Sequence, residues 1–179
     1  MNRATTAGKT LLPLMLALSV SGCGLTQKVS EGTASITKSI FYKQIRTLHL
    51  DFRAREGANR NAQGAALSTV VRIWQLKDSK DFDASDYPSL LAADSQVLKA
   101  DLLAQKDIRI RPGESVSIDM PMDDKAEFVA VAGLFLSPDT QDDQWRILLT
   151  RDDLDPDNAR VIELGDGTLT LVAEKAKRP

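Results

Sequence analysis

The fold of this 179-residue chain is decided by the stretch Phe128-Val129-Ala130-Val131-Ala132-Gly133-Leu134-Phe135-Leu136. Its residues are apolar on both of the faces that a strand presents in turn, and its valines and phenylalanines favour an extended backbone. A strand that is apolar on both faces is covered on both, which places this one at the centre of a sandwich. The segment Ser137-Pro138-Asp139 ends the run. We therefore expect a mainly β protein built around residues 128–136.

Alternating apolar and polar residues predict further strands on either side of this central run. They lie at residues 48–53, 70–76, 108–111, 116–120, 145–149, 161–164 and 169–173. Turn residues separate several of them, as in Arg111-Pro112-Gly113-Glu114 and Gly165-Asp166-Gly167. About eight short strands, mostly joined by hairpins, are typical of an antiparallel β-sandwich of two sheets.

Residues 77–104 break this strand pattern. Asp78 or Ser79 can cap a short helix around Phe82, and either residue 85 (serine) or residue 86 (aspartate) can cap a second one. The leucines that follow have mixed spacing. We expect a helical insertion over 77–104 that crosses one edge of the β-domain.

The first 22 residues have the plan of a secretory signal peptide. Arg3 and Lys9 precede an apolar run over residues 11–20, and no acidic residue stands among them. The run is about half as long as the roughly 20 residues that span a membrane, so it directs export without staying as an anchor. Small and polar residues then predict a flexible tether at 23–38, ahead of a β-sandwich domain at 39–174 and a loose tail at 175–179.

The segment Val20-Ser21-Gly22-Cys23 resembles the bacterial lipobox, in which an aliphatic residue and two small residues precede a cysteine. In proteins of that class the thiol receives a diacylglyceryl group, the chain is cut before the cysteine, and the new amino group is acylated. A thiol suits this step because thiolate is a strong nucleophile. Gly24 follows in place of aspartate, which by resemblance to enterobacterial lipoproteins favours the outer membrane. The alternative is an ordinary signal peptide that happens to have a cysteine near its end.

Composition narrows the classes of partner and of chemistry. Loss of Arg3 and Lys9 with the signal peptide reduces the 23 basic residues to 21, against 25 acidic residues, so no basic excess indicates a nucleic-acid partner. The single cysteine, once lipidated, offers no disulfide, and the fold depends on its packed core. His49 is the only histidine, so a catalytic triad or a histidine-based metal site lacks its other members.

Two clusters of aspartates invite comparison with metal sites. Asp153, Asp155 and Asp157 offer oxygen ligands at alternate positions, as a calcium loop does. However, Asn158 and Leu164 stand where an EF-hand needs glycine and a bidentate glutamate. The second cluster comprises Asp139, Asp142 and Asp143. We interpret both clusters as solvated acidic turns, with a lipid-anchored hydrolase that uses aspartates as a remaining hypothesis.

The connection between the first two strands, residues 55–65, is too long for a plain hairpin, which takes about 2–5 residues. It has no large apolar residue, and its glycines leave backbone amides free to bond a partner. Arg55 and Arg60 suit carboxylates, and arginine is favoured at interfaces. A floppy loop without a role is the alternative. The candidate partner-binding residues are Arg55, Glu56, Gly57, Asn59, Arg60, Asn61, Gln63 and Gly64.

Several of these segments stand in the order found in a known family. They are the lipobox, the strand at 70–78 with Phe82 after it, Asp101-Leu102-Leu103, Ile110-Arg111-Pro112-Gly113-Glu114, the central run at 128–135, and Trp145-Arg146. Together they resemble the TssJ family (also called VasD or SciN), the outer-membrane lipoproteins of type VI secretion systems. The resemblance covers residues 23–174, and Trp74 departs from it because tyrosine is common there in the family.

The resemblance implies a transthyretin-like sandwich with added helical elements and no enzymatic activity. It implies no cofactor or metal beyond the covalent lipid on Cys23, an S-diacylglycerol and an N-acyl group. It also implies a partner, the periplasmic C-terminal region of the inner-membrane protein TssM, and through TssM an indirect link to TssL. In the family the loop between the first two strands is a main TssM contact, and here that loop is residues 55–65. The alternative from another class is a periplasmic lipoprotein that binds a small ligand in a cleft of the sandwich.

Overall fold

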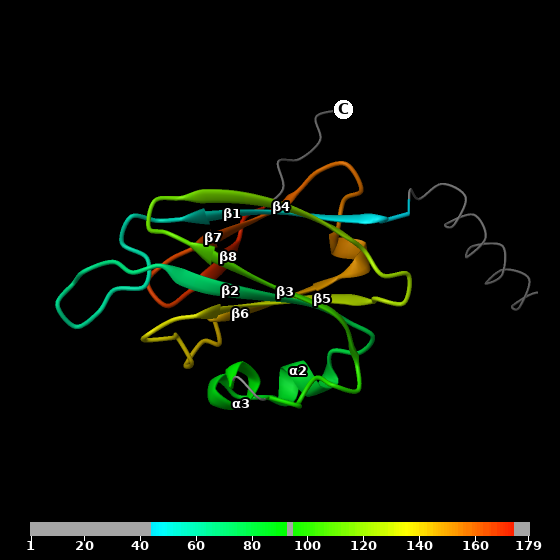
Figure 1. The fold of residues 1–179 in the computed structure, drawn as a ribbon, viewed down its shortest axis with the longest axis horizontal. Coiled ribbons are helices and arrows are strands. Elements are labelled where there is room, and N and C mark those ends of the chain that lie inside the picture. The colour runs from blue at the N-terminus through cyan, green and yellow to red at the C-terminus, as the bar shows by residue number, and fades with distance from the viewer. Residues whose placement is uncertain (1–43, 93–94, 174–179) are drawn as a thin grey trace, which may run out of the picture. The chain divides into compact units, whose positions relative to one another are not determined.

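The computed structural model describes residues 44–92 and 95–173. The expected signal peptide at 1–22, the tether at 23–38 with its Cys23, and the tail at 175–179 lie outside these ranges. Within them, eight strands form two four-stranded sheets that pack face to face (Figure 1). The expected two-sheet β-sandwich is confirmed. No helix of the described ranges has the length and apolar character needed to cross a bilayer.

The first sheet has the strand order β4-β1-β7-β8. Its strands are β1 (Thr47–Ala54), β4 (Ser115–Pro121), β7 (Arg160–Leu164) and β8 (Leu169–Leu171). β1 is an interior strand that pairs with β4 in antiparallel and with β7 in parallel orientation. This parallel pair is the exception to antiparallel pairing in the described residues. It is allowed because β7 arrives from the other sheet, and such a connection does not impose the reversal that a tight hairpin does.

The second sheet has the strand order β3-β2-β5-β6. Its strands are β2 (Thr69–Leu76), β3 (Leu102–Ile110), β5 (Phe128–Leu134) and β6 (Arg146–Thr150). The strand predicted to be central, β5, lies in its interior beside β2. Residues 129–132 of β5 are completely buried, because one face of this strand meets the other sheet and the opposite face is covered as well. The prediction from the central run is therefore confirmed.

Four connections between successive described strands cross from one sheet to the other: β1–β2, β3–β4, β4–β5 and β6–β7. The expectation that hairpins join most strands is wrong for these four. The turn at 111–114 forms as predicted, with a bond from the amide of Glu114 to the carbonyl of Arg111 (3.0 Å) and a φ of +75° at Gly113. It nevertheless joins β3 and β4, which belong to different sheets. Alternation shows which side of a strand faces the core, but it does not identify the neighbouring strand.

Two short helices cover the outer face of the second sheet (Figure 1). They are α2 (Lys80–Ala84) and α3 (Tyr87–Leu91). The predicted cap of the second helix forms, because Asp86 accepts a bond from the amide of Ser89 (2.9 Å). The insertion is shorter than the predicted 77–104, since β3 already begins at Leu102. The alternation of that edge strand is weak at its first residues, which is why the pattern did not reveal its start.

An aromatic contact and one arginine fasten these helices to the sheet. Phe82 of α2 packs edge-on against Trp74 of β2, with ring centroids 5.9 Å apart. Arg146 of β6 donates to the carbonyls of Phe82 (2.5 Å) and Ser85 (2.9 Å), and its guanidinium lies over the Phe82 ring. The helical insertion is therefore packed as part of the domain.

The core is continuous through both sheets and the helical insertion. Its largest fully buried side chains are Trp145, Phe52, Phe82, Leu48, Leu50, Ile73, Leu76, Leu90, Ile110, Leu149, Ile162 and Leu164. The buried polar residue Gln75 is satisfied, since its amide group donates to the carbonyl of Pro121 (2.8 Å) and accepts from the amide of Asp123 (2.8 Å). A short 3-10 helix, η1 (Arg151–Asp153), follows β6 and leads back to the first sheet.

Candidate functional site

Residues 55–68 connect β1 of the first sheet to β2 of the second. We call them the crossing loop. Their length, too great for a hairpin, is explained because the chain has to pass from one sheet to the other. The crossing loop lies at the same end of the sandwich as the β5–β6 loop and the β7–β8 hairpin (left side of Figure 1).

Asn61 closes the tip of the crossing loop. Its side-chain oxygen Oδ1 accepts from the amides of Gln63 (3.0 Å) and Ala65 (2.9 Å), and its own amide donates to the carbonyl of Ala65 (3.0 Å). Gly64 adopts a φ of +80° with open space around it, a conformation that glycine adopts at little cost. The tip is therefore a defined turn that presents the exposed residues 62–65 to solvent.

The two arginines of the crossing loop pair with carboxylates of the β7–β8 region. Arg55 forms an ion pair with Glu163. Arg60 binds Asp166 twice, through its backbone amide (2.8 Å) and through its side-chain Nε (3.0 Å). The bond from the Arg60 amide, helped by the guanidinium, holds the pKa of Asp166 below its usual value. Both arginine side chains remain more than half exposed, yet each already has a carboxylate partner within this chain.

Asn59 holds the base of the crossing loop from inside. It is 4% exposed and has a φ of +52°, a left-handed conformation that asparagine tolerates better than most residues. Its Nδ2 donates to the carbonyl of Ser68 (3.2 Å), and its Oδ1 accepts from the amide of Leu136 (2.8 Å). Its backbone carbonyl accepts from the amide of Leu67 (3.2 Å). This candidate residue is therefore placed where it shapes the loop, and its side-chain groups are already bonded.

The other candidate residues of the crossing loop differ in their surroundings. Glu56 and Gln63 are exposed. Gly57 is half-buried, and a Cβ at this position would lie 3.6 Å from the guanidinium carbon of Arg60. The available polar surface of the loop is thus concentrated at its tip and at Glu56.

Two exposed leucines beside Asn59 were not predicted from the sequence. Leu67 is 39% exposed and lies just beyond the predicted loop. Leu136 is 59% exposed, although its place in the central apolar run predicted a buried strand residue. β5 ends at Leu134, so Leu136 belongs to the following loop. Leu136 stands directly before Ser137-Pro138, which ends the apolar run, and this position could have indicated that Leu136 lies outside the strand.

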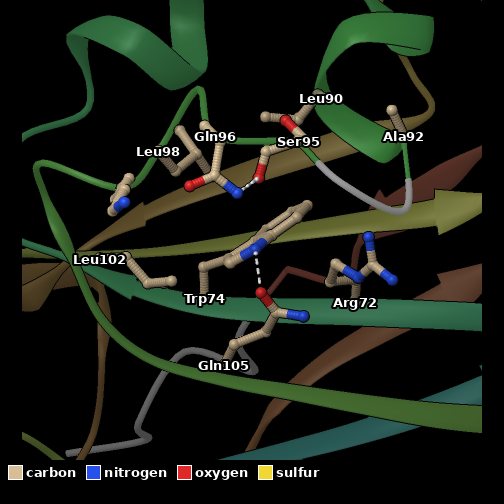
Figure 2. Close-up of a pocket in the computed structure, with 10 residues that line it drawn as sticks. Arg72, Trp74, Leu90, Ala92, Ser95, Gln96, Leu98, Leu102 and Gln105 are labelled. Atoms are coloured by element: carbon tan, nitrogen blue, oxygen red, sulfur yellow. Dashed lines mark hydrogen bonds between the residues drawn. The ribbon is translucent and has the colours of Figure 1, made fainter.

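A pocket under the helical insertion is a second candidate site. It measures about 180 Å³, and the indole of Trp74 lies in it, donating through Nε1 to the side-chain oxygen of Gln105 (3.1 Å; Figure 2). Arg72 lies at one side and donates through Nε (2.9 Å) and Nη2 (2.8 Å) to Asp107. Small-molecule sites usually measure about 300–1,000 Å³. This pocket is smaller, so it does not favour the small-ligand alternative.

The histidine and the acidic residues that were considered for chemistry serve local structure. His49 pairs with Asp119 across β1 and β4, with Nδ1 and Oδ1 2.5 Å apart. Asp153 accepts from the hydroxyl (2.7 Å) and the amide (2.8 Å) of Thr150, and these bonds hold the pKa of Asp153 below its usual value. Asp155 accepts from the amides of residues 157 and 158. Across residues 44–92 and 95–173, no three histidines, cysteines or acidic residues are grouped closely enough to hold a metal ion.

Comparison with protein-family models identifies a match over residues 46–167, to the family described as type VI secretion lipoprotein, VasD, EvfM, TssJ. This range contains the crossing loop and every described strand except β8. A comparison with curated proteins gives no match.

Solved structures similar to this chain come from type VI secretion systems. The chain is 50% identical, with a TM-score of 0.67, to a chain of the structure "T6SS protein TssM C-terminal domain (869-1107) from EAEC". It is 52% identical, with a TM-score of 0.70, to a chain of the structure "Type VI membrane complex". Each match covers 73% of this chain and 100% of the other. The lipoprotein TssJ1 from Pseudomonas aeruginosa is 24% identical and shares the fold, with a TM-score of 0.61 over 73% of this chain and 98% of its own.

Proposed function

Because this chain belongs to the family of type VI secretion lipoproteins that includes TssJ and VasD, we propose that it anchors a type VI membrane complex at the outer membrane by binding the periplasmic C-terminal region of TssM. The observation that carries this proposal is the likeness, at 50% and 52% identity, to chains of the structures of a TssM C-terminal domain and of a type VI membrane complex. TssL is then linked to this protein indirectly, through TssM.

The proposed anchor is the covalent lipid on Cys23, an S-diacylglycerol with an N-acyl group, in the outer membrane. Two or more acyl chains give stable membrane attachment, because each buried methylene contributes about 0.8 kcal/mol. A flexible tether of about 15 residues has a reach near 20 Å, which is enough to hold the domain in the periplasm close to the bilayer.

The proposed contact with TssM is the crossing loop, residues 55–68. The described chain begins at residue 44, shortly before β1, and the crossing loop follows the other end of this strand. A strand of eight residues is about 25 Å long, so the start of β1 and the crossing loop lie at opposite ends of the sandwich. This arrangement supports a domain held at one end by its lipid and presenting the other end to a protein that crosses the periplasm. The tether also raises the effective concentration of the loop for such a partner.

Within this proposed contact, the candidate residues divide into two roles. Glu56, Arg60, Gln63 and Gly64 lie on accessible surface and contact TssM, together with Arg55 at the rim. Gly57, Asn59 and Asn61 hold the shape in which these residues are presented.

Removal of the loop tip tests this function. A chain lacking residues 62–64 is expected to bind the TssM periplasmic C-terminal region at least tenfold more weakly in biolayer interferometry, because interface residues that matter cost more than about 1 kcal/mol when removed. Its melting temperature should stay close to that of the parent, since these residues are exposed. The matched control is Asp124→Ala with Lys125→Ala, two exposed residues in the β4–β5 connection at the opposite end. Parental affinity in the shortened chain would remove the loop tip from the contact.

A further inference from the structure

We propose that the partner of this domain is held mainly through an apolar contact made by Leu67 and Leu136, with the charged residues of the crossing loop forming only its rim. This inference rests on the proposed function, because it names the part of the same surface that supplies the affinity. The centre of the contact is then not the polar residues predicted from the sequence. It is formed by Leu67, just outside the predicted loop, and by Leu136, about 70 positions further along the chain.

The first support is the exposure of apolar side chains. The exposed large hydrophobic residues of the described chain are Leu67, Leu102, Leu136 and Val172. Leu136 is the most exposed of them at 59%, and Leu67 is 39% exposed. Single exposed leucines are ordinary on a protein surface, so the case for these two depends on their being held by one residue at the same end of the sandwich.

The second support is that one buried residue holds both leucines in place. The amide of Leu67 donates to the backbone carbonyl of Asn59 (3.2 Å), and the amide of Leu136 donates to the Asn59 side-chain oxygen (2.8 Å). The strands next to these leucines are adjacent, since Val70 of β2 pairs with Leu134 of β5. Two loops far apart in sequence are thus fastened side by side. A surface ordered in advance loses less conformational entropy on binding, which favours affinity.

The third support is that the two arginines of the crossing loop already have partners. Arg55 pairs with Glu163, and Arg60 pairs with Asp166 through two hydrogen bonds. A partner carboxylate would have to compete with these internal pairs, whereas the two leucines compete with nothing. Interfaces of this kind have an apolar centre whose polar surroundings exclude water.

These observations define the partner segment by its chemistry. It presents at least two large aliphatic or aromatic side chains to the leucine pair, and it carries little net charge at that point. Around them it offers groups that hydrogen-bond to the exposed loop tip. The occupant to which we commit is a segment of the TssM periplasmic C-terminal region, because this patch is continuous with the crossing loop proposed to bind it.

Binding of the TssM periplasmic C-terminal region to the full chain, measured by isothermal titration calorimetry, tests the inference. Leu136→Ser is expected to weaken binding at least tenfold, and the double variant Leu67→Ser with Leu136→Ser about a hundredfold or more. The matched control Leu102→Ser, at a leucine of β3 that is about as exposed as Leu67, should bind as the parent does. Leu136→Met, which keeps an apolar side chain, should retain most of the affinity. Thermal melting checks that each variant is folded.

Salt concentration provides an independent readout. An apolar contact loses little affinity between about 0.05 and 0.5 M NaCl, whereas contacts between exposed charges are screened over that range. We expect less than a threefold change for the parent chain. Parental affinity in the folded double leucine variant, or a tenfold loss of parental affinity in high salt, would overturn the inference while leaving TssM binding intact. Absence of any binding by the parent chain would overturn the proposed function as well.

Discussion

At the scale of single residues, Asn59 links the crossing loop to the strand around which the fold is built. It is buried, it has a positive φ, and its side chain bonds to the loop after β5 and to the residue before β2. Few side chains combine tolerance of a left-handed backbone with both a donor and an acceptor, and asparagine is one of them. The identity of this residue is therefore explained by position and bonding together.

Replacing Asn59 should destabilise the domain measurably. Asn59→Ala removes two hydrogen bonds, leaves the amide of Leu136 without its acceptor and places alanine at positive φ, so we expect a loss of about 2–3 kcal/mol in the free energy of unfolding. Asn59→Gly relieves the backbone strain but not the lost bonds, and it should lose less. Urea denaturation of the two variants and the parent measures both. If alanine is as stable as the parent, Asn59 does not fasten the loop.

At the scale of elements, the pair Arg60 and Asp166 fastens the crossing loop to the β7–β8 hairpin. Both the amide and the guanidinium of Arg60 bond to the two carboxylate oxygens of Asp166. These bonds favour the ionised carboxylate, so the pKa of Asp166 in the folded chain lies below its unfolded value of about 3.9. The attachment between the two segments is consequently sensitive to acid.

The lowered pKa of Asp166 decides whether acid stabilises or destabilises the folded chain. Since the folded-state pKa of Asp166 is the lower one, its stabilising contribution is fully present above pH of about 4 and is lost as the pH falls through the folded-state value. We expect the urea midpoint of the parent to decrease from pH 6 to pH 3, and the midpoint of Asp166→Asn to start lower and decrease less. Urea denaturation of the parent and of Asp166→Asn at each pH measures the two midpoints. An equally steep decrease in the variant would show that this carboxylate contributes nothing.

At the scale of the whole molecule, β1 connects the start of the described chain to the crossing loop. Its first residue is Thr47, and its last residue, Ala54, leads into the crossing loop. β1 itself is an interior strand of the first sheet, held by β4 on one side and β7 on the other. The crossing loop therefore follows a strand that is hydrogen-bonded on both sides.

Loss of the proposed lipid should abolish membrane attachment and leave the folded domain intact. A Cys23→Ser chain is expected to be recovered in the soluble periplasmic fraction, because no acyl group holds it to the bilayer. Its melting temperature should match that of the parent domain, since the described core lies entirely within residues 44–173. Cell fractionation, mass spectrometry of the intact protein and thermal melting provide the measurements. A Cys23→Ser chain that stays acylated and membrane-bound would contradict the proposed anchor.

Much of the architecture could be predicted because it depends on local patterns. The apolar run at 128–136 predicted a central strand, alternation predicted its neighbours, and Asp86 was correctly expected to cap a helix. The site was less predictable. The length of the connection at 55–65 drew attention to the right segment, but the pattern could not show that Asn59 is buried or that Leu136 is exposed.

The order of amino acids alone was sufficient for the β-sandwich class, the two short helices with the cap of the second, the family and the unusual length of the first connection. Strand partners, the crossings between sheets, the parallel pair of β1 and β7, and the meeting of Leu67 with Leu136 at Asn59 appeared only in the folded chain. The period of the apolar residues shows which side of a strand or helix faces the core and which faces solvent, and this information is local to each segment. Which distant segments meet is set by how both sheets and the helical insertion bury a common core together, and no single segment contains that information.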